Sequence, residues 1–202
     1  MTAGYSSARG SAEGGAEALP TRRAAPLFSG AGPLPDGTPV RIRPLMAGDR
    51  GLLFAGFAAL SPRSRRSRFL REVSDAQFER MLSVLLDTVD QQSHVALLLY
   101  ADDRPIGVGR LFRFTSDPAV ADLAVTVADD WQGRGVGSVL ARELLARAEG
   151  VREIQTVVSR GNAASLRMLA RLGQMRSDCV NGTCDVVIHV PRPSAAGLAD
   201  AA

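Results

Sequence analysis

The sequence contains no lysine and very little cysteine or histidine. All 24 of its basic residues are arginine, and it has two cysteines and two histidines among 202 residues. Two cysteines are too few for a disulfide-rich scaffold, and these four residues are too scattered to match the spacing of a metal site. We therefore expect a domain without bound metal, and one with no side-chain ammonium of its own that could be modified.

Long hydrophobic runs are also missing. The longest, at residues 51–60 and 95–100, fall well short of the roughly 20 residues that a membrane-spanning helix needs. The N-terminus lacks the basic region followed by an apolar stretch that marks a secretory signal. These absences predict a cytoplasmic protein with no membrane partner.

The charge balance and composition favour one folded domain. The formal net charge is only +3, and the chain is 46% hydrophobic and 22% charged, as in ordinary globular proteins. So small an excess of arginine, without interleaved aromatic residues, is not a nucleic-acid-binding composition. We expect no nucleic-acid partner.

Composition also divides the chain. Residues 1–37 and 193–202 are rich in Gly, Ala, Ser and Pro and show neither a strand period nor a helix period. Such segments cannot bury enough apolar surface to offset the entropy of ordering, so both are predicted to be disordered tails. The folded domain is predicted to span residues 38–192.

Between the tails, strand-like and helix-like segments alternate. The clearest helix start is the capping box at residues 74–77, because apolar residues recur behind it with helical spacing. Strands are predicted at residues 40–43, 94–100, 105–115, 119–128, 153–159 and 174–190, and helices after Asp49, Ser61, Ser74 and Gly135 and at residues 163–172. This order indicates an α/β domain with one mixed sheet.

The segment at 174–190 is predicted to be a β-hairpin, because Asn181 and Gly182 both accept the positive φ angles of a two-residue turn. In that register Cys179 lies opposite Cys184. A cross-strand disulfide is geometrically feasible, but in a reducing cytosol we expect two packed thiols.

The segment with the most chemical information is Gln-Gly-Arg-Gly-Val-Gly at 132–137, between a predicted strand and a predicted amphipathic helix. Glycines without Cβ let successive backbone N–H groups turn toward one point, and a helix N-terminus adds partial positive charge. This is the chemistry of a phosphate cradle; a tight turn that needs glycine only for its geometry is the alternative. No Gly-Lys-Ser/Thr follows, as a Walker loop requires, and the glycine spacing fits a dinucleotide fingerprint poorly.

This segment resembles the acetyl-CoA loop of the GNAT acetyltransferases, Gln/Arg-x-x-Gly-x-Gly/Ala, and the resemblance covers most of residues 38–190. It implies an α/β fold with a single GNAT-like domain, whose mixed, mostly antiparallel sheet is splayed at the central parallel pair and flanked by helices. Acetyl-CoA would be the co-substrate, with its pantetheine arm between the splayed strands. The residues implied to bind it are Val125, Thr126, Val127, Gln132, Gly133, Arg134, Gly135, Val136, Gly137, Ser138 and Asn162. For Asn162, an ordinary helix N-cap is an equally good local explanation.

Further segments resemble one branch of that family, the bacterial protein lysine acetyltransferases. They are Arg-Ile-Arg-Pro at 41–44, the segment at 61–70, and Val-Ala-Asp-Asp-Trp-Gln at 127–132. This branch often fuses its GNAT domain to a nucleotide-binding or ligase-like domain, for which residues 1–37 are too short. The resemblance implies an N-acetyltransferase that acts on a primary amine, with a protein lysine favoured, by direct attack in a ternary complex.

Two positions depart from the catalytic pattern of the family. In the resembled enzymes a Glu on the central strand takes the proton of the attacking amine. Here that position holds Asp122, which is one methylene shorter and would act as the catalytic base through a water. A carboxylate there could also simply face solvent at a sheet edge. Leu169 replaces a tyrosine that protonates the leaving thiolate in many members, which leaves the general acid unassigned.

Two other functions stay open. The acceptor could be a small-molecule amine, such as a polyamine, amino acid or aminoglycoside, although arginines in the first helices argue mildly against a polycation. The departures at Asp122 and Leu169 also allow a catalytically weak acyl-CoA-binding sensor module. The arginines at 63, 65, 66, 68 and 71 are themselves predicted to form a solvated helix face.

Overall fold

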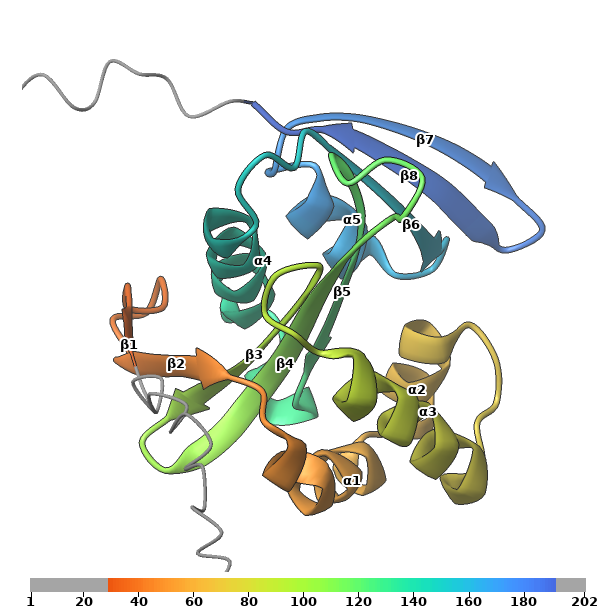
Figure 1. Ribbon diagram of the computed structural model, residues 1–202. Coiled ribbons are helices and arrows are strands. Elements are labelled where there is room, and N and C mark those ends of the chain that lie inside the picture. Colours follow the sequence, from red (N-terminus) through yellow and green to blue (C-terminus); the bar gives the residue numbers. More distant parts are fainter. Residues whose placement is uncertain (1–28, 192–202) are drawn as a thin grey trace, which may run out of the picture.

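One mixed sheet of eight strands organises the part of the chain that the computed structural model describes, residues 29–191 (Figure 1). The strands are β1 (Ser29–Ala31), β2 (Val40–Pro44), β3 (His94–Ala101), β4 (Arg104–Arg113), β5 (Val120–Val127), β6 (Glu153–Ser159), β7 (Gln174–Val180) and β8 (Thr183–His189). They lie in the order β1-β2-β3-β4-β5-β6-β8-β7, and within these residues only β5 and β6 are parallel neighbours. The predicted fold class is confirmed.

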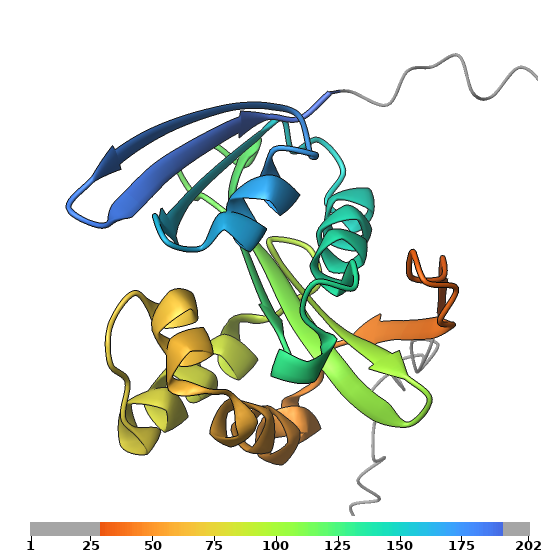
Figure 2. The same ribbon diagram turned by 180° about the vertical axis from the view of Figure 1, so that it is seen from behind.

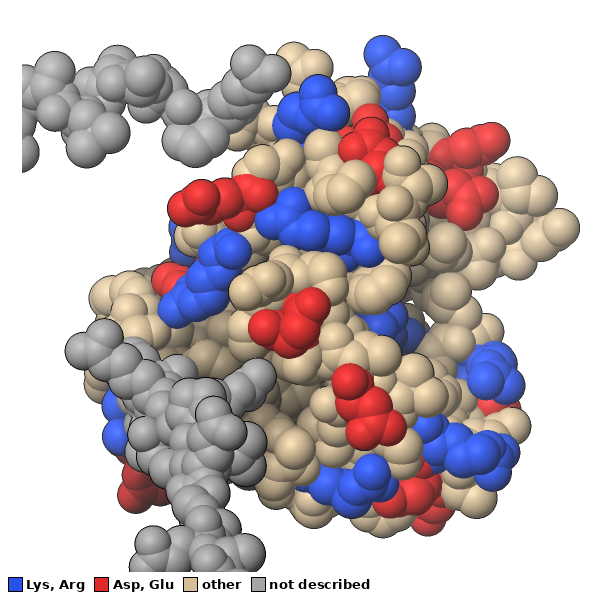
Figure 3. Space-filling model, viewed as in Figure 1, with Lys and Arg blue, Asp and Glu red and all other residues tan. Residues whose placement is uncertain are grey.

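Helices cover both faces of this sheet. They are α1 (Arg50–Ala59), α2 (Pro62–Phe69), α3 (Asp75–Thr88), α4 (Val136–Arg147) and α5 (Ala163–Leu169), with 3-10 turns at Ala47–Asp49 and Asp129–Trp131. Figures 1 and 2 show α4 and α5 on one side of the sheet and α1–α3 gathered on the other. No helix in the described range is long and apolar enough to cross a membrane. On the face drawn in Figure 3, arginine and acidic side chains are interspersed.

The short polar segments before α2 and α3 explain where these helices begin. Ser61 accepts a hydrogen bond from the backbone N–H of Ser64 at 3.3 Å, and Pro62 occupies the first helical position, where no N–H is needed. Ser74 and Gln77 form the predicted capping box, in which each side chain accepts from the other's backbone N–H. Helix α5 ends at Leu169, three residues before its predicted end.

Strand β3 belongs to both interiors of the molecule because its side chains alternate between the two faces. Leu97 and Leu99 join the leucines of α4 in the first core, whereas Ala96 and Leu98 pack in the second core with Leu82 of α3. Every residue of β3 is buried, as expected for a strand that is covered on both sides. The sheet therefore separates a core under α4 from a core under α1–α3.

The domain begins earlier than predicted. Ser29–Ala31 form β1, which pairs with β2 at the edge of the sheet, and Leu34 is buried. The prediction of disorder is wrong for residues 29–37, because pairing with an edge strand and one buried leucine leave no periodic signal in a segment rich in Gly and Pro. The rest of the two predicted tails lies outside the described residues.

The hairpin of β7 and β8 has the predicted register, with Val180 opposite Thr183 and Cys179 opposite Cys184. The two sulfurs are joined in a disulfide, which contradicts the expectation of free thiols. That expectation rested on the redox state of the cytosol, whereas direct cross-strand pairing beside a tight turn brings the two side chains within bonding distance.

Candidate functional site

The centre of the sheet opens between its two parallel strands. β5 and β6 pair only at Val120–Glu153 and Ala121–Ile154, and the hydroxyl of Thr156 then donates to the carbonyl oxygen of Leu123 at 3.2 Å. Beyond this point the strands diverge, while β6 keeps its full pairing with β8 (Figure 1). The second half of β5 therefore presents backbone N–H and C=O groups toward an opening that no described strand fills.

The glycine-rich segment lies at the end of β5 and leads directly into α4. Gly133 and Gly135 have φ angles of 76° and 91°, in the left-handed region that favours glycine. Gly135 is the N-cap of α4, so no side chain accepts from the first backbone N–H groups of the helix. Such donors and the positive end of a helix are a combination that can bind an anion.

Two of these glycines are also held by close neighbours. A Cβ on Gly135 would lie 2.6 Å from Cδ of Pro35, so the segment before β2 packs directly on the loop. A Cβ on Gly137 would lie 3.1 Å from Sδ of Met168 in α5 and within 4 Å of Val125 and Val127. The loop is therefore fixed between the N-terminal segment, β5 and α5, so close packing is one reason for glycine at positions 135 and 137.

The side chains of the predicted loop residues differ in exposure, because Gln132 is exposed, the side chain of Arg134 is 37% exposed and Val136 is buried. Val136 is only 1% exposed and belongs to the first core, and Ser138 is partly buried in the first turn of α4. Arg134 donates to Asp36 at 2.7 Å, and its guanidinium lies 4.0 Å from the centre of the Trp131 ring. Hydrogen bonds from Thr38 and then from Arg134 lower the pKa of Asp36 to about 2. The contacts of Val136 and Arg134 therefore anchor the loop to the rest of the domain.

Gln132 and Asp129 connect the same loop to α2. The amide of Gln132 donates to Asp129 at 2.9 Å and to the hydroxyl of Ser64 at 3.0 Å. Asp129 also accepts from the backbone N–H of Ser61 at 2.7 Å, at the start of α2. Burial opposes ionisation of Asp129, but hydrogen bonds from Ser64 and Ser61 outweigh it and lower the pKa of that carboxyl. The ionised carboxylate of Asp129 thus joins the glycine-rich loop to the layer of α1–α3.

Asn162 and Leu169 lie on α5, beside the splayed end of β6. The side-chain oxygen of Asn162 accepts from the backbone N–H of Ser165 at 3.1 Å, so this residue does act as an N-cap. Leu169 is 2% exposed and belongs to the first core, so it supplies no hydroxyl to the site.

Asp122 projects from β5 toward the face covered by α1–α3. Along β5 it shares this face with Ala124 and Thr126, whereas Leu123 and Val125 face α4. Its Oδ2 lies 3.2 Å from Nη2 of Arg110 on β4, and its side chain is 27% exposed. β5 lies between β4 and β6 in the sheet, but its pairing with β6 ends at Ala121, so Asp122 is the first residue of the unpaired half of the strand.

Arg68 of α2 was predicted to lie on a solvated helix face, and the structure turns it inward. Its Nε donates to the hydroxyl of Thr126 at 3.0 Å. Burial, together with the charge of Arg110, lowers its pKa to about 10 against the opposing effect of Asp122, so Arg68 stays charged at neutral pH. Arg68 and Arg110 had no signal in the sequence, because their partners lie 58 and 12 residues away.

A cavity of about 210 Å³ lies between this face of the sheet and α1–α3. Among the described residues, Arg68, Arg110 and Thr126 are the only ones with polar side chains that line it, and none of the carboxylates of these residues does. Within residues 29–191, no group of three or more His, Cys, Asp or Glu side chains could hold a metal ion. The site therefore consists of a backbone anion cradle, an open strand edge, one carboxylate and an apolar cavity with two cations.

The chain is similar in sequence to known acetyltransferases. The model of the acetyltransferase (GNAT) family matches residues 56–174. Acetyltransferase PA5475 of Pseudomonas aeruginosa is 37% identical over 145 residues, which cover 69% of this chain and 77% of that protein. Acetyltransferase Pat of Mycolicibacterium smegmatis is 30% identical over 138 residues, which cover 65% of this chain but only 40% of that protein.

Solved structures share the fold. The GNAT domain of S. lividans PAT matches with a TM-score of 0.68 and 21% identity, over 81% of this chain and 97% of that one. Aminoglycoside acetyltransferase AAC(6')-Ib, solved in complex with coenzyme A, matches with a TM-score of 0.57 and 19% identity, over 74% and 94% of the two chains. At these identities the likeness concerns the fold alone.

Proposed function

The chain belongs to the acetyltransferase (GNAT) family, and we propose that it transfers the acetyl group of acetyl-CoA to the side-chain amine of a lysine on a protein. Acyl transfer that depends on acetyl-CoA is the general activity of this family. The observation that carries the proposal is the uncapped N-terminus of α4 at the end of a strand that has separated from its parallel neighbour.

The residues around the splay would hold the co-substrate from three sides. The backbone N–H groups of residues 133–138 would bind its phosphates, and the uncovered edge of β5 at Val125–Val127 would bind its pantetheine amides. Asn162 would complete the site from the end of β6, where its carbonyl oxygen is already used as a cap. The side chains of Gln132 and Arg134 would keep the loop in place.

Asp122 is the group that we assign to the proton of the amine. A neutral amine nitrogen forms a bond to the acetyl carbon while the carbon–sulfur bond breaks, and its surplus proton passes to Asp122 through a water. Arg110 holds Oδ2, so that Oδ1 is the oxygen available to this water. The departing thiolate takes its proton from solvent, since Leu169 carries none. The products are an amide and the free thiol of coenzyme A.

A protein lysine is the acceptor that we favour. The chain resembles the lysine acetyltransferase branch in the segments at 41–44, 61–70 and 127–132. Polycationic acceptors are disfavoured, because the charged side chains that line the cavity beside Asp122 are, among the described residues, Arg68 and Arg110. The positive charges of these two arginines would repel a polyamine or an aminoglycoside.

The test is to incubate the protein with acetyl-CoA and a lysine-bearing protein extract, and to follow new acetyl-lysines by mass spectrometry. The variant Asp122→Asn should lower turnover by about 10²–10⁴-fold, the usual contribution of a positioned base, while acetyl-CoA binding measured by Trp131 fluorescence stays unchanged. The control is Asp103→Asn, on the fully exposed turn between β3 and β4, which should keep full turnover.

Three results would contradict parts of this proposal. If Asp122→Asn keeps its turnover, the base is another group. If only small amines become acetylated, the lysine acceptor is wrong. Acetyl-CoA binding without transfer to any amine would show a binding module instead of an enzyme.

A further inference from the structure

The apolar cavity under α1–α3 reaches the sheet beside the proposed reaction centre. It is lined on β5 by Ala124 and Thr126, which alternate with Val125 on the strand assigned to pantetheine. Asp122, the proposed base, lies two residues before Ala124 on the same face of β5. The cavity therefore begins next to the place where the acyl carbon must meet the amine.

The size of this cavity exceeds what an acetyl group needs. Its volume is about 210 Å³, and a cavity of roughly 150 Å³ lined by Leu, Ile and Phe is already large enough to bind benzene. An acetyl group has one methyl group to bury. The space therefore suits a flexible chain of about six carbons.

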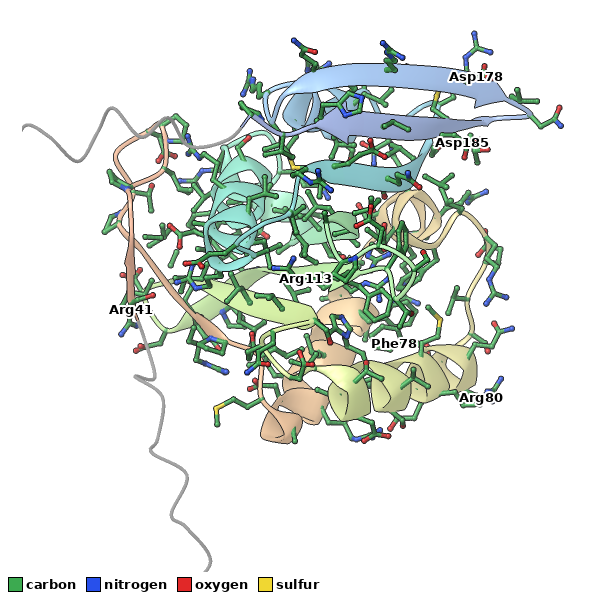
Figure 4. The ribbon with its side chains drawn as sticks, turned by 45° about the horizontal axis from the view of Figure 1, so that its top comes forward. Arg41, Phe78, Arg80, Arg113, Asp178 and Asp185 are labelled. Atoms are coloured by element: carbon green, nitrogen blue, oxygen red, sulfur yellow. A yellow bond between two sulfur atoms is a disulfide. The ribbon has the colours of Figure 1, made fainter. Side chains whose placement is uncertain are left out.

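The walls are apolar over most of their surface. Phe57 and Phe78 stack on each other with ring centres 4.0 Å apart, and Leu82, Leu98 and Val108 also line the space. Figure 4 shows Phe78 directed from α3 toward the sheet. Each methylene group buried in such surroundings improves binding by about fourfold.

The charges at the cavity decide between the two substrates that could enter it. None of its lining residues is acidic, and Arg68 and Arg110 are positively charged. A lysine amine, which is protonated until it reaches a base, would be repelled there. The hydrocarbon part of an acyl group carries no charge and meets no such penalty.

We propose that this cavity is an acyl-chain pocket and that the enzyme uses straight-chain acyl-CoA thioesters of four to six carbons more efficiently than acetyl-CoA. The inference rests on the proposed function, whose chemistry it leaves unchanged. The amine nitrogen bonds to the acyl carbon, the carbon–sulfur bond breaks, and coenzyme A leaves as the thiol. Only the chain attached to the acyl carbon is longer.

The experiment compares kcat/KM for acetyl-, butyryl-, hexanoyl- and succinyl-CoA with the same lysine-bearing acceptor. We expect kcat/KM for butyryl-CoA to exceed that for acetyl-CoA by about tenfold, from two further buried methylenes, and kcat/KM for hexanoyl-CoA to exceed it by more than this, from four. Val108→Phe places a ring in the cavity and should lower the hexanoyl-to-acetyl ratio at least tenfold. Val84→Phe, the same change at a position of α3 that is 63% exposed, should leave the ratio unchanged.

A second variant keeps the test valid if Val108→Phe unfolds the protein, which its melting curve would show. Gly56 of α1 also lines the cavity, and a Cβ built on it meets nothing within 4 Å, so Gly56→Leu can be accommodated. It should lower the same ratio. An unchanged ratio in a folded Val108→Phe or Gly56→Leu variant would overturn the pocket.

The two proposals fail in different ways. Transfer of acetyl alone would overturn the pocket and leave the proposed function intact. A preference for succinyl-CoA would have the same meaning, because Arg68 and Arg110 would then bind the carboxylate of the succinyl group. If no acyl group is transferred but hexanoyl-CoA binds more tightly than acetyl-CoA by Trp131 fluorescence, the proposed function fails and the pocket stands.

Discussion

The two faces of the sheet are packed in opposite ways. Under α4, Gly107 and Gly109 of β4 let Leu140 and Leu144 descend so far that a Cβ on either glycine would lie within 3 Å of a leucine carbon. Under α1–α3, the same strands border a cavity of about 210 Å³. The face that carries the phosphate loop is therefore a closed platform, whereas the face that carries Asp122 retains space for a substrate.

The two layers are also attached to the sheet by different forces. Helix α4 is held by apolar contacts, with Val139, Leu140 and Leu144 almost fully buried. The layer of α1–α3 has a smaller apolar core and an ion pair at its edge. In this pair, Arg43 of β2 donates one hydrogen bond to each carboxylate oxygen of Asp49, both at 2.7 Å. We expect the two faces to respond differently to truncation, to acid and to added volume.

The largest difference should appear when the same truncation is made on both faces. Leu140→Ala should lower the free energy of unfolding by about 4 kcal/mol, because the closed α4 face cannot fill the space left behind. Leu82→Ala, beside a cavity that already exists, should cost only about 2 kcal/mol. Urea denaturation of both variants measures this difference. Equal losses would show that the two faces are packed equally well.

The ion pair of Arg43 and Asp49 should make the α1–α3 layer sensitive to acid. Burial raises the pKa of Asp49, but hydrogen bonds from Arg43 and the N–H of Met46 outweigh it, and the net shift is downward. The ion pair therefore stabilises the folded state fully at pH values above the ordinary pKa of an Asp carboxyl, near 4. This stabilisation is lost as pH falls through the lower pKa that Asp49 has in the folded state.

Removing the charge of Asp49 should lower the free energy of unfolding at neutral pH and make this free energy depend less on pH in acid. Asp49→Asn leaves Arg43 without a charged partner at a site where both side chains are 11% exposed, and should cost about 3 kcal/mol at pH 7. Urea denaturation between pH 2 and pH 7 tests both effects. If the variant loses stability in acid as steeply as the wild type does, the loss of stability in acid comes from other carboxyl groups.

The smallest effect should come from adding one methyl group on each face. At Gly107 a Cβ would lie 2.9 Å from Leu140 and 3.1 Å from Val136, so Gly107→Ala should destabilise by about 1–2 kcal/mol through overpacking. Gly56→Ala, in α1 with open space around it, should stabilise by about 0.5–1 kcal/mol, because alanine favours the helix. Thermal melting distinguishes these opposite signs, and a loss at both positions would remove the contrast between the faces.

Features with a local physical cause were predicted well from the sequence. The capping box at Ser74, the Asn181–Gly182 turn with its register and the glycine-rich start of α4 each depend on neighbouring residues. The face of β5 that carries Asp122 also follows from simple alternation along a strand. Its proposed role as a base stays a prediction.

Features that depend on distant contacts were missed or mistaken. β1 exists only because β2 is there to pair with it, and the inward turn of Arg68 requires Thr126, which lies 58 residues further along the chain. The contacts of Gln132 with Ser64 and of Arg134 with Asp36 were likewise not predicted, whereas the binding of acetyl-CoA by these residues stays a prediction. In each case the partner is far away in sequence, so no local pattern records it.

The sequence by itself determined the fold class, the family and the position of the glycine-rich turn before α4, because backbone conformation and periodicity are set by residues within a few positions of one another. The tertiary structure alone decided the face of the sheet that carries Asp122: the cavity, the two arginines that line it and the attachment of α1–α3. Empty volume and buried charge are properties of how separate elements meet. The helices and strands that line this cavity are α1, α2, α3, β3, β4 and β5.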